Sequence, residues 1–143
     1  MKIRLINLIK LSIVIIFISS NSYANNTYYN DGLIFFNKKE FDKAKFKFEQ
    51  DLVYNPKSEN SYLYLSKIFN VQKKKNLEEQ NLDAVLLLNP KNEEAVYNLA
   101  KLKLENSDYL QSKKLIDRLL SFCKNYCKQS KLLKNEINSS IKK

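Results

Sequence analysis

Apolar side chains recur at steps of three and four residues through most of the chain, instead of alternating with polar ones. The spacing is clear at Leu65, Ile68 and Phe69 and again at Leu82 and Val85. This period is typical of amphipathic α-helices, and the helix-favouring residues Lys, Leu, Glu and Gln dominate the same segments. The pattern predicts an all-α protein with helices near residues 27–38, 41–54, 58–71, 75–88, 92–105, 109–122 and 127–143.

Two Asn-Pro-Lys segments, at residues 55–57 and 89–91, divide these helices at a fixed interval. Their prolines, Pro56 and Pro90, are the only two in the sequence and stand 34 positions apart. Proline ends a helix because it has no amide hydrogen to donate and because it forces the preceding residue out of helical geometry. Helix stops repeated at this period are typical of stacked helical arrays. We therefore predict three repeat units of equal length, at residues 25–58, 59–92 and 93–126.

The residue types within each unit resemble those of the tetratricopeptide repeat (TPR) family, whose helix-turn-helix unit keeps small residues where its two helices approach. Counted from Asn25, the family's positions 4, 8, 11, 17, 20, 24 and 32 are filled by Tyr28, Gly32, Phe35, Phe41, Ala44, Phe48 and Pro56. The other units match less completely: Lys75 and Glu78 depart from the pattern in the second, and Lys124 replaces the proline in the third. The resemblance implies an α-solenoid of three repeats, closed by a basic capping helix over residues 127–143.

The resemblance also implies that the first helix of each unit lines a concave groove, which would bind a peptide or a helix of another protein. The groove positions are filled here by Tyr29, Leu33, Phe36, Leu63, Lys67, Asn70, Tyr97, Asn98 and Lys101. Alternatively, Leu33, Phe36 and Leu63 pack between neighbouring helices. One variant of the family holds a partner's terminal carboxylate with a clamp that includes Lys at position 5 of the first unit. This chain has Tyr29 there, so we do not expect that clamp.

The first 24 residues have the order of a secretory signal peptide. Lys2, Arg4 and Lys10 make a basic start, residues 11–18 are apolar, and Ser22 and Ala24 are the small residues that precede a cleavage point. We expect cleavage after Ala24 and export, with the periplasm of a Gram-negative bacterium as the compartment. The alternative is an uncleaved membrane anchor, but a membrane-spanning helix needs about 20 apolar residues.

Positive charge is concentrated at the end of the chain. The sequence has a net charge of +10, and residues 113–143 contribute nine Lys and Arg against two acids. Lys128, Lys131 and Lys134 form a basic patch that is either the solvated side of the cap or a weak contact with an anionic membrane surface or an acidic protein. Nucleic acid is not expected as a partner, because no aromatic residue follows Tyr126 to stack on bases.

Cys123 and Cys127 bracket the turn that lacks its proline in the third unit. In an oxidising compartment we expect them to form a structural disulfide that stiffens this turn. A redox role is the alternative, although the spacing differs from the C-x-x-C motif of disulfide oxidoreductases.

The composition leaves little material for catalysis or for cofactor binding. There is no His, only two Cys and a single Gly, so neither a zinc or histidine-based site nor a Gly-rich phosphate loop is expected. We expect no metal, no cofactor and no enzymatic activity. The sequence indicates a protein-interaction scaffold of the cell envelope whose partner is another protein or a peptide. The alternatives are a surface tether that uses the basic helix and an assistant to envelope redox chemistry.

Overall fold

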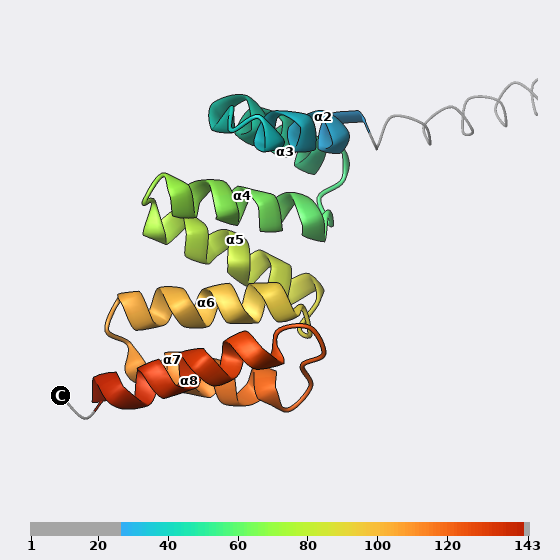
Figure 1. Ribbon diagram of the computed structural model, residues 1–143. Helices are drawn as coiled ribbons and strands as arrows, with labels where there is room; N and C mark the ends of the chain where they lie inside the picture. Colours follow the sequence, from blue (N-terminus) through green and yellow to red (C-terminus); the bar gives the residue numbers. More distant parts are fainter. Residues whose placement is uncertain (1–26, 142–143) are drawn as a thin grey trace, which may run out of the picture. The chain divides into compact units, whose positions relative to one another are not determined.

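The computed structural model describes residues 27–141, and within this range all regular secondary structure is α-helical (Figure 1). The chain divides after Pro56 into two compact units. The first contains α2 (Thr27–Asn37) and α3 (Phe41–Tyr54), and the second contains α4 (Glu59–Val71), α5 (Lys75–Leu88), α6 (Glu93–Glu105), α7 (Tyr109–Leu120) and α8 (Cys127–Ile141). The predicted signal peptide lies outside the described residues.

The helices begin in the phase that the two prolines indicate. The helices α3, α5 and α7 begin at Phe41, Lys75 and Tyr109, so that each start follows the previous one by the interval between the prolines. The starts of α4, α6 and α8 at Glu59, Glu93 and Cys127 have the same spacing. Every observed boundary from 27 to 141 lies within two residues of the predicted one. Asn89, before Pro90, is extended at φ −136° and ends α5, as a residue preceding proline should.

In the first unit, α2 and α3 form a hairpin that is packed around Phe48. The ring of Phe48 is fully buried and lies against Gly32 of α2, where a Cβ atom would come within 2.6 Å of the ring. Ala44, one turn before Phe48, is also fully buried. Small residues therefore stand where the two helices approach each other, as the resemblance implies.

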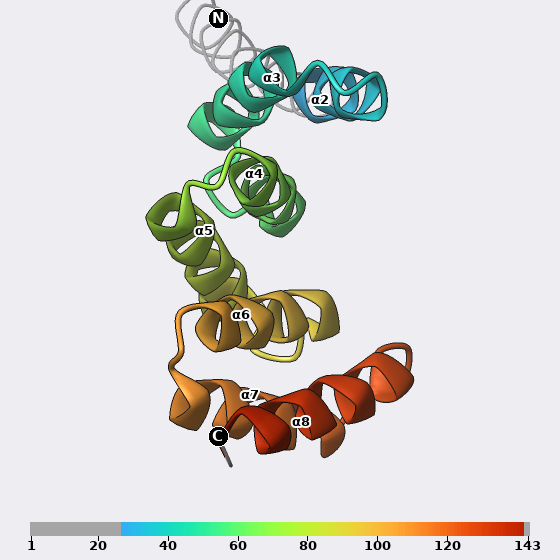
Figure 2. The same ribbon diagram turned by 60° about the vertical axis from the view of Figure 1, so that its left-hand side comes forward.

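In the second unit, each helix packs against the next in chain order, and α8 also contacts α6. Figure 2 shows α4, α6 and α8 following one another on one side of this unit, with α5 and α7 on the other. One apolar cluster joins the α4–α5 hairpin to α6 and consists of Leu63, Leu82, Val85, Ala95, Leu99 and Leu102. A second joins the α6–α7 hairpin to α8 and consists of Val96, Ala100, Ile116, Leu119, Leu133 and Ile137. Because α8 contributes two buried residues to the second cluster, it closes that end of the hydrophobic core.

The turn inside each hairpin contains one residue in the left-handed conformation, and none of the three is glycine. These residues are Lys39, Lys73 and Ser107, with φ of 60°, 57° and 60°. Each turn is closed by the same backbone bond, in which the amide after the left-handed residue donates to a carbonyl of the last helical turn at 2.9 Å. This is the Schellman arrangement of a helix C-terminus.

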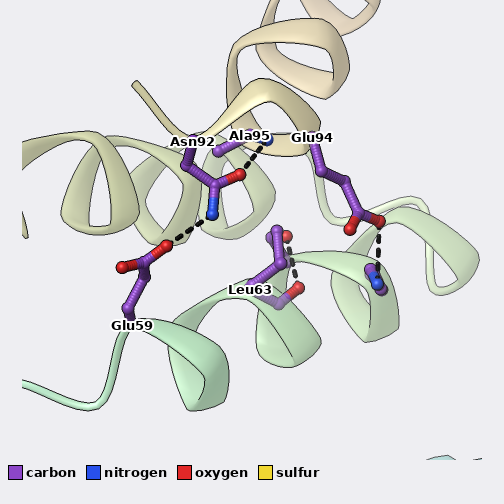
Figure 3. Close-up of polar contacts among 7 residues, drawn as sticks. Glu59, Leu63, Asn92, Glu94 and Ala95 are labelled. Carbon is purple, nitrogen blue, oxygen red and sulfur yellow. Dashed lines mark hydrogen bonds and ion pairs between the residues drawn. The ribbon is translucent and has the colours of Figure 1, made fainter. Parts of the chain in front are cut away.

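A glutamate at the start of α4 and of α6 holds the turn that follows its own hairpin. Glu59 accepts hydrogen bonds from the side-chain amides of Asn89, at 3.0 Å, and Asn92, at 2.5 Å; Figure 3 shows the bond from Asn92. Glu93 lies one repeat later and accepts three backbone N–H bonds, at 2.8, 2.8 and 2.9 Å, from residues 124–126. These bonds lower the pKa of the Glu93 carboxyl, with the N–H of Tyr126 having the largest effect. The same device therefore fixes the α5–α6 turn and the α7–α8 turn of the second unit.

Candidate functional site

The candidate site lies on the second unit, on side chains of α4, α6 and α8 outside the buried residues of the two apolar clusters; of these, Tyr97 packs against the second cluster. We call this surface the first-helix face. It consists of Lys67 on α4, Glu94, Tyr97, Asn98 and Lys101 on α6, and Lys128 and Lys131 on α8, all of which are at least partly exposed. Because a helix turns once in 3.6 residues, Glu94, Tyr97 and Lys101 share one side of α6.

An ion pair connects α4 to α6 across this face. Lys67 Nζ lies 2.8 Å from Glu94 Oε1, an ion pair that the dashed line at Glu94 marks in Figure 3. The same ammonium group lies 4.6 Å from the centre of the Tyr64 ring. Both charged side chains are largely buried, since their exposed fractions are 28% and 30%. The positive charge of Lys67 is therefore already neutralised within the protein, and this lysine is a structural link more than a free contact for a partner.

Two tyrosines connect α6 to the start of α8. The rings of Tyr97 and Tyr126 lie 5.5 Å apart and are tilted by 48°. Tyr126 also makes a side-chain hydrogen bond with Glu94. Partial burial raises the pKa of Tyr126, and the negative charges of Glu94 and Glu93 raise it further. The Tyr126 phenol therefore stays neutral at physiological pH, and the two rings offer flat, partly exposed apolar surface with a polar edge.

Lys101 is the cation that α6 contributes to the first-helix face. Its side chain is 55% exposed, and its nearest carboxylate is Glu105, one turn later in the same helix, at 3.9 Å. Exposed pairs of this kind contribute little to stability and exchange readily with other partners. Lys101 therefore has the exposure and the weak pairing that the sequence interpretation requires of a partner-binding residue.

The predicted basic patch divides into two parts. Lys134 forms an ion pair with Asp117 of α7 at 2.7 Å, and Lys113 binds the same carboxylate at 3.0 Å. These two ammonium groups lower the pKa of Asp117. In contrast, Lys128 and Lys131 are exposed and have no carboxylate within ion-pair distance in the described part of the chain. These two members of the patch present positive charge on the first-helix face.

Two residues expected in the groove have structural roles instead. Leu63 is buried in the cluster that joins α4 to α5 and α6. Its side chain is apolar and α5 and α6 cover it, which is the alternative that the sequence left open. Asn70 donates from Nδ2 to Glu78 Oε1 at 3.0 Å, and Glu78 is itself buried. Burial raises the pKa of Glu78, so the amide of Asn70 stabilises a carboxyl group that has lost its water.

The three candidates on α2 are engaged with their own hairpin. Tyr29 lies 5.8 Å from Phe48 between ring centres, and Phe36 lies 5.6 Å from Phe41 in an edge-to-face arrangement. Leu33 is half-buried. These side chains stabilise the first unit, and the parts that remain exposed belong to that unit alone.

The two cysteines bracket the end of the turn between α7 and α8 and are joined by a disulfide with a Cα–Cα distance of 5.3 Å. The same turn is held by the carboxylate of Glu93, a contact that the sequence interpretation did not include. Among residues 27–141 no group of three His, Cys, Asp or Glu side chains is placed to bind a metal ion. Within the same range, no helix combines the length and the apolar character that crossing a bilayer requires.

Comparison with solved structures identifies the fold. The TPR domain of Arabidopsis OM64 matches with a TM-score of 0.74 and 17% identity, over 84% of this chain and 98% of that domain. The first TPR of Spaghetti (RPAP3), bound to the HSP90 peptide SRMEEVD, matches with a TM-score of 0.77 and 15% identity, over 85% and 96%. The chain has the tetratricopeptide repeat fold.

A bacterial TPR-fold protein is among the matches as well. The Yersinia enterocolitica type III secretion chaperone SycD, in complex with a peptide of the translocator YopD, has a TM-score of 0.68 and 14% identity, over 87% of this chain and 93% of that one. No model of a protein family and no curated protein matches the sequence. The TPR resemblance drawn from the sequence, with its α-solenoid of three repeats and a capping helix, is therefore confirmed as the fold.

Proposed function

We propose that this protein is a non-enzymatic interaction scaffold that binds a peptide or helix of another protein on the first-helix face. The observation that carries this proposal is the combination, on one exposed side of α6, of the Tyr97 ring beside Tyr126 and the weakly paired Lys101. Aromatic rings and exposed cations are the groups that recur at binding hot spots, because they bury much area and orient a partner. Half-buried Asn98 adds an amide that can bind the backbone of a peptide.

Two of the similar TPR-fold structures support a peptide as the ligand. Spaghetti (RPAP3) was solved with an HSP90 peptide, and SycD with a peptide of YopD. Their identity to this chain is low, so they support the class of ligand and not its sequence.

Two substitutions on α6 test the proposal. Tyr97→Ala with Lys101→Glu should remove the aromatic anchor and reverse the charge on the first-helix face. A matched control is Leu110→Ala with Lys114→Glu, which has the same four-residue spacing on α7, at exposed positions outside this face. In-cell crosslinking followed by affinity purification and mass spectrometry should show partner proteins that are lost with the α6 variant and retained with the α7 variant. Equal partner profiles for the two variants would contradict the proposal.

We further propose that the scaffold works in the cell envelope, after export and cleavage behind Ala24. The support is the order of basic, apolar and small residues at the start of the sequence. Determination of the N-terminus of the protein from a periplasmic fraction should give Asn25. A chain that keeps Lys2 and fractionates with cytosolic proteins would refute this placement.

A further inference from the structure

The link between α4 and α6 has a counterpart one repeat later, and that counterpart lacks its negative charge. Lys67 on α4 pairs with Glu94 on α6 at 2.8 Å. The equivalent residues in the next repeat are Lys101 on α6 and Lys128 on α8. The step from α6 to α8 therefore has two cations where the step from α4 to α6 has a cation and an anion.

The helix α8 occupies the place of a fourth first helix. It begins one full repeat after α6, contacts both α7 and α6, and lies in line with α4 and α6 in Figure 2. Its buried residues Ser130 and Leu133 follow the buried Val96 and Leu99 of α6 by the same interval. Lys128 and Lys131 therefore have the positions on α8 that Glu94 and Tyr97 have on α6.

The positive charge at this step is only partly compensated within the described part of the protein. Lys101 pairs with Glu105 at 3.9 Å and also lies within electrostatic range of Glu78, whereas Lys128 and Lys131 are without a carboxylate partner among residues 27–141. The Tyr97–Tyr126 ring pair borders the same step. A cluster of exposed cations beside aromatic surface is complementary to an acidic group on an otherwise partly apolar ligand.

We propose that an acidic side chain of a bound peptide lies between Lys101 and Lys128 and pairs with both, as the carboxylate of Glu94 pairs with Lys67 one repeat earlier. Lys131 lies one turn along α8 and binds a second acidic group of the same peptide. This inference rests on the proposed function, and it specifies the partner as a peptide segment that carries Asp or Glu next to an apolar or aromatic residue.

A peptide fits this surface better than an anionic membrane does. A bilayer surface attracts all exposed cations of a protein in rough proportion to their number. It would therefore use Lys114 and Lys124, which are exposed elsewhere in the same unit, as readily as Lys128. The feature that distinguishes Lys128 is its repeat position next to Lys101 and the tyrosines, which is specific to a ligand that follows the first-helix face.

The test combines peptide selection with two charge-matched variants of the full chain. Lys128→Glu supplies the missing carboxylate beside Lys101 and should close the site, whereas Lys114→Glu makes the same change in net charge on α7. A phage library of random peptides is selected on the unmodified protein. One enriched peptide is then synthesised together with a version in which its Asp and Glu are changed to Asn and Gln, and binding is measured by fluorescence polarisation.

We expect the enriched peptides to contain acidic residues and the neutral version to bind about tenfold more weakly, as for the loss of a few exposed charge pairs. Lys128→Glu should weaken binding of the acidic peptide by a similar factor, and Lys114→Glu should change its affinity by less than about twofold. Enriched peptides without acidic residues, or equal effects of the two variants, would overturn the inference and leave the proposed scaffold intact. If no peptide is enriched, both proposals fail. The protein is also tested for binding to vesicles that contain phosphatidylglycerol. If it binds them and the two variants weaken this binding equally, the exposed lysines contact a membrane instead.

Discussion

The contact between Gly32 and Phe48 yields a prediction in which the sign of a mutational effect depends on a second residue. A Cβ atom at Gly32 would lie 2.6, 2.8 and 2.9 Å from three ring atoms of Phe48. Phe48 is 0% exposed, and Tyr29 packs against it, so the ring has no free space into which it can move. Gly32→Ala should therefore introduce a steric conflict in the first unit.

Two opposing terms set the size of the effect. Forcing an extra carbon into a packed core costs about 1–3 kcal/mol. Alanine inside a helix is favoured over glycine by about 1 kcal/mol. In the unmodified protein the conflict outweighs the helix term, and Gly32→Ala should lower the free energy of unfolding by about 1 kcal/mol. In a Phe48→Val background the three ring atoms are gone, so the same substitution should raise it by about 1 kcal/mol.

Urea unfolding followed by circular dichroism measures all four members of this double-mutant cycle. The coupling free energy should be about 2 kcal/mol, well above the roughly 0.5 kcal/mol expected for independent sites. The control is Phe46→Val, an exposed phenylalanine of the same helix, in whose background Gly32→Ala should remain destabilising. The reasoning is refuted if Gly32→Ala stabilises the unmodified protein, or if its effect is the same in the Phe48→Val and Phe46→Val backgrounds.

Three further predictions test the second unit by chemical or thermal denaturation. Leu133→Ala should lower the free energy of unfolding by about 2–5 kcal/mol and Leu132→Ala by less than about 0.5 kcal/mol, because these neighbours are 4% and 62% exposed; equal losses would mean that α8 is rotated. Glu93→Gln should lower the free energy of unfolding at pH 7. The difference from the unmodified protein should shrink as the pH falls below about 4.3, because the pKa of Glu93 is lowered in the folded protein and only its ionised form stabilises the fold. A constant difference down to pH 2 would contradict this. Glu78→Gln keeps an acceptor for Asn70 and should raise the melting temperature at pH 7, where ionisation of a carboxyl with a raised pKa opposes folding. This gain should shrink as the pH falls through the raised pKa of Glu78 and should be gone below about 4.3, the ordinary pKa of Glu. A loss of stability at pH 7 would show that the charge of Glu78 is needed.

The helix boundaries could be predicted because few residue types set them. Pro56 and Pro90 fix the ends of α3 and α5, and the phase of the repeat places the remaining helices even where α7 ends without a proline. The turns inside the hairpins were less visible. Lys39, Lys73 and Ser107 adopt a left-handed conformation that usually selects glycine, so residue type gave no signal and only their common spacing indicates them.

The site was predicted in part, because repeat position indicates a side of a helix but not how deeply a side chain is covered. Leu63 and Tyr97 have equivalent positions, yet the smaller apolar residue is enclosed by α5 and α6 while the tyrosine is only partly buried, beside Tyr126. The pairing of Lys67 with Glu94 depends on which helices are neighbours in space, which the spacing of apolar residues does not specify. The paired positions of Glu59 and Glu93 were a usable signal, since both stand three residues after a proline at the same phase.

The most direct test of the account is site-specific photo-crosslinking from the first-helix face. Benzoylphenylalanine replaces Tyr97 in one variant and Leu87 in another, because Leu87 is 84% exposed on α5 and lies outside that face. After irradiation in cells, the account predicts a discrete covalent adduct with another protein from position 97 and none of comparable yield from position 87. Adducts of the same protein from position 87 alone, or from neither position, would contradict the claim that the first-helix face binds the partner.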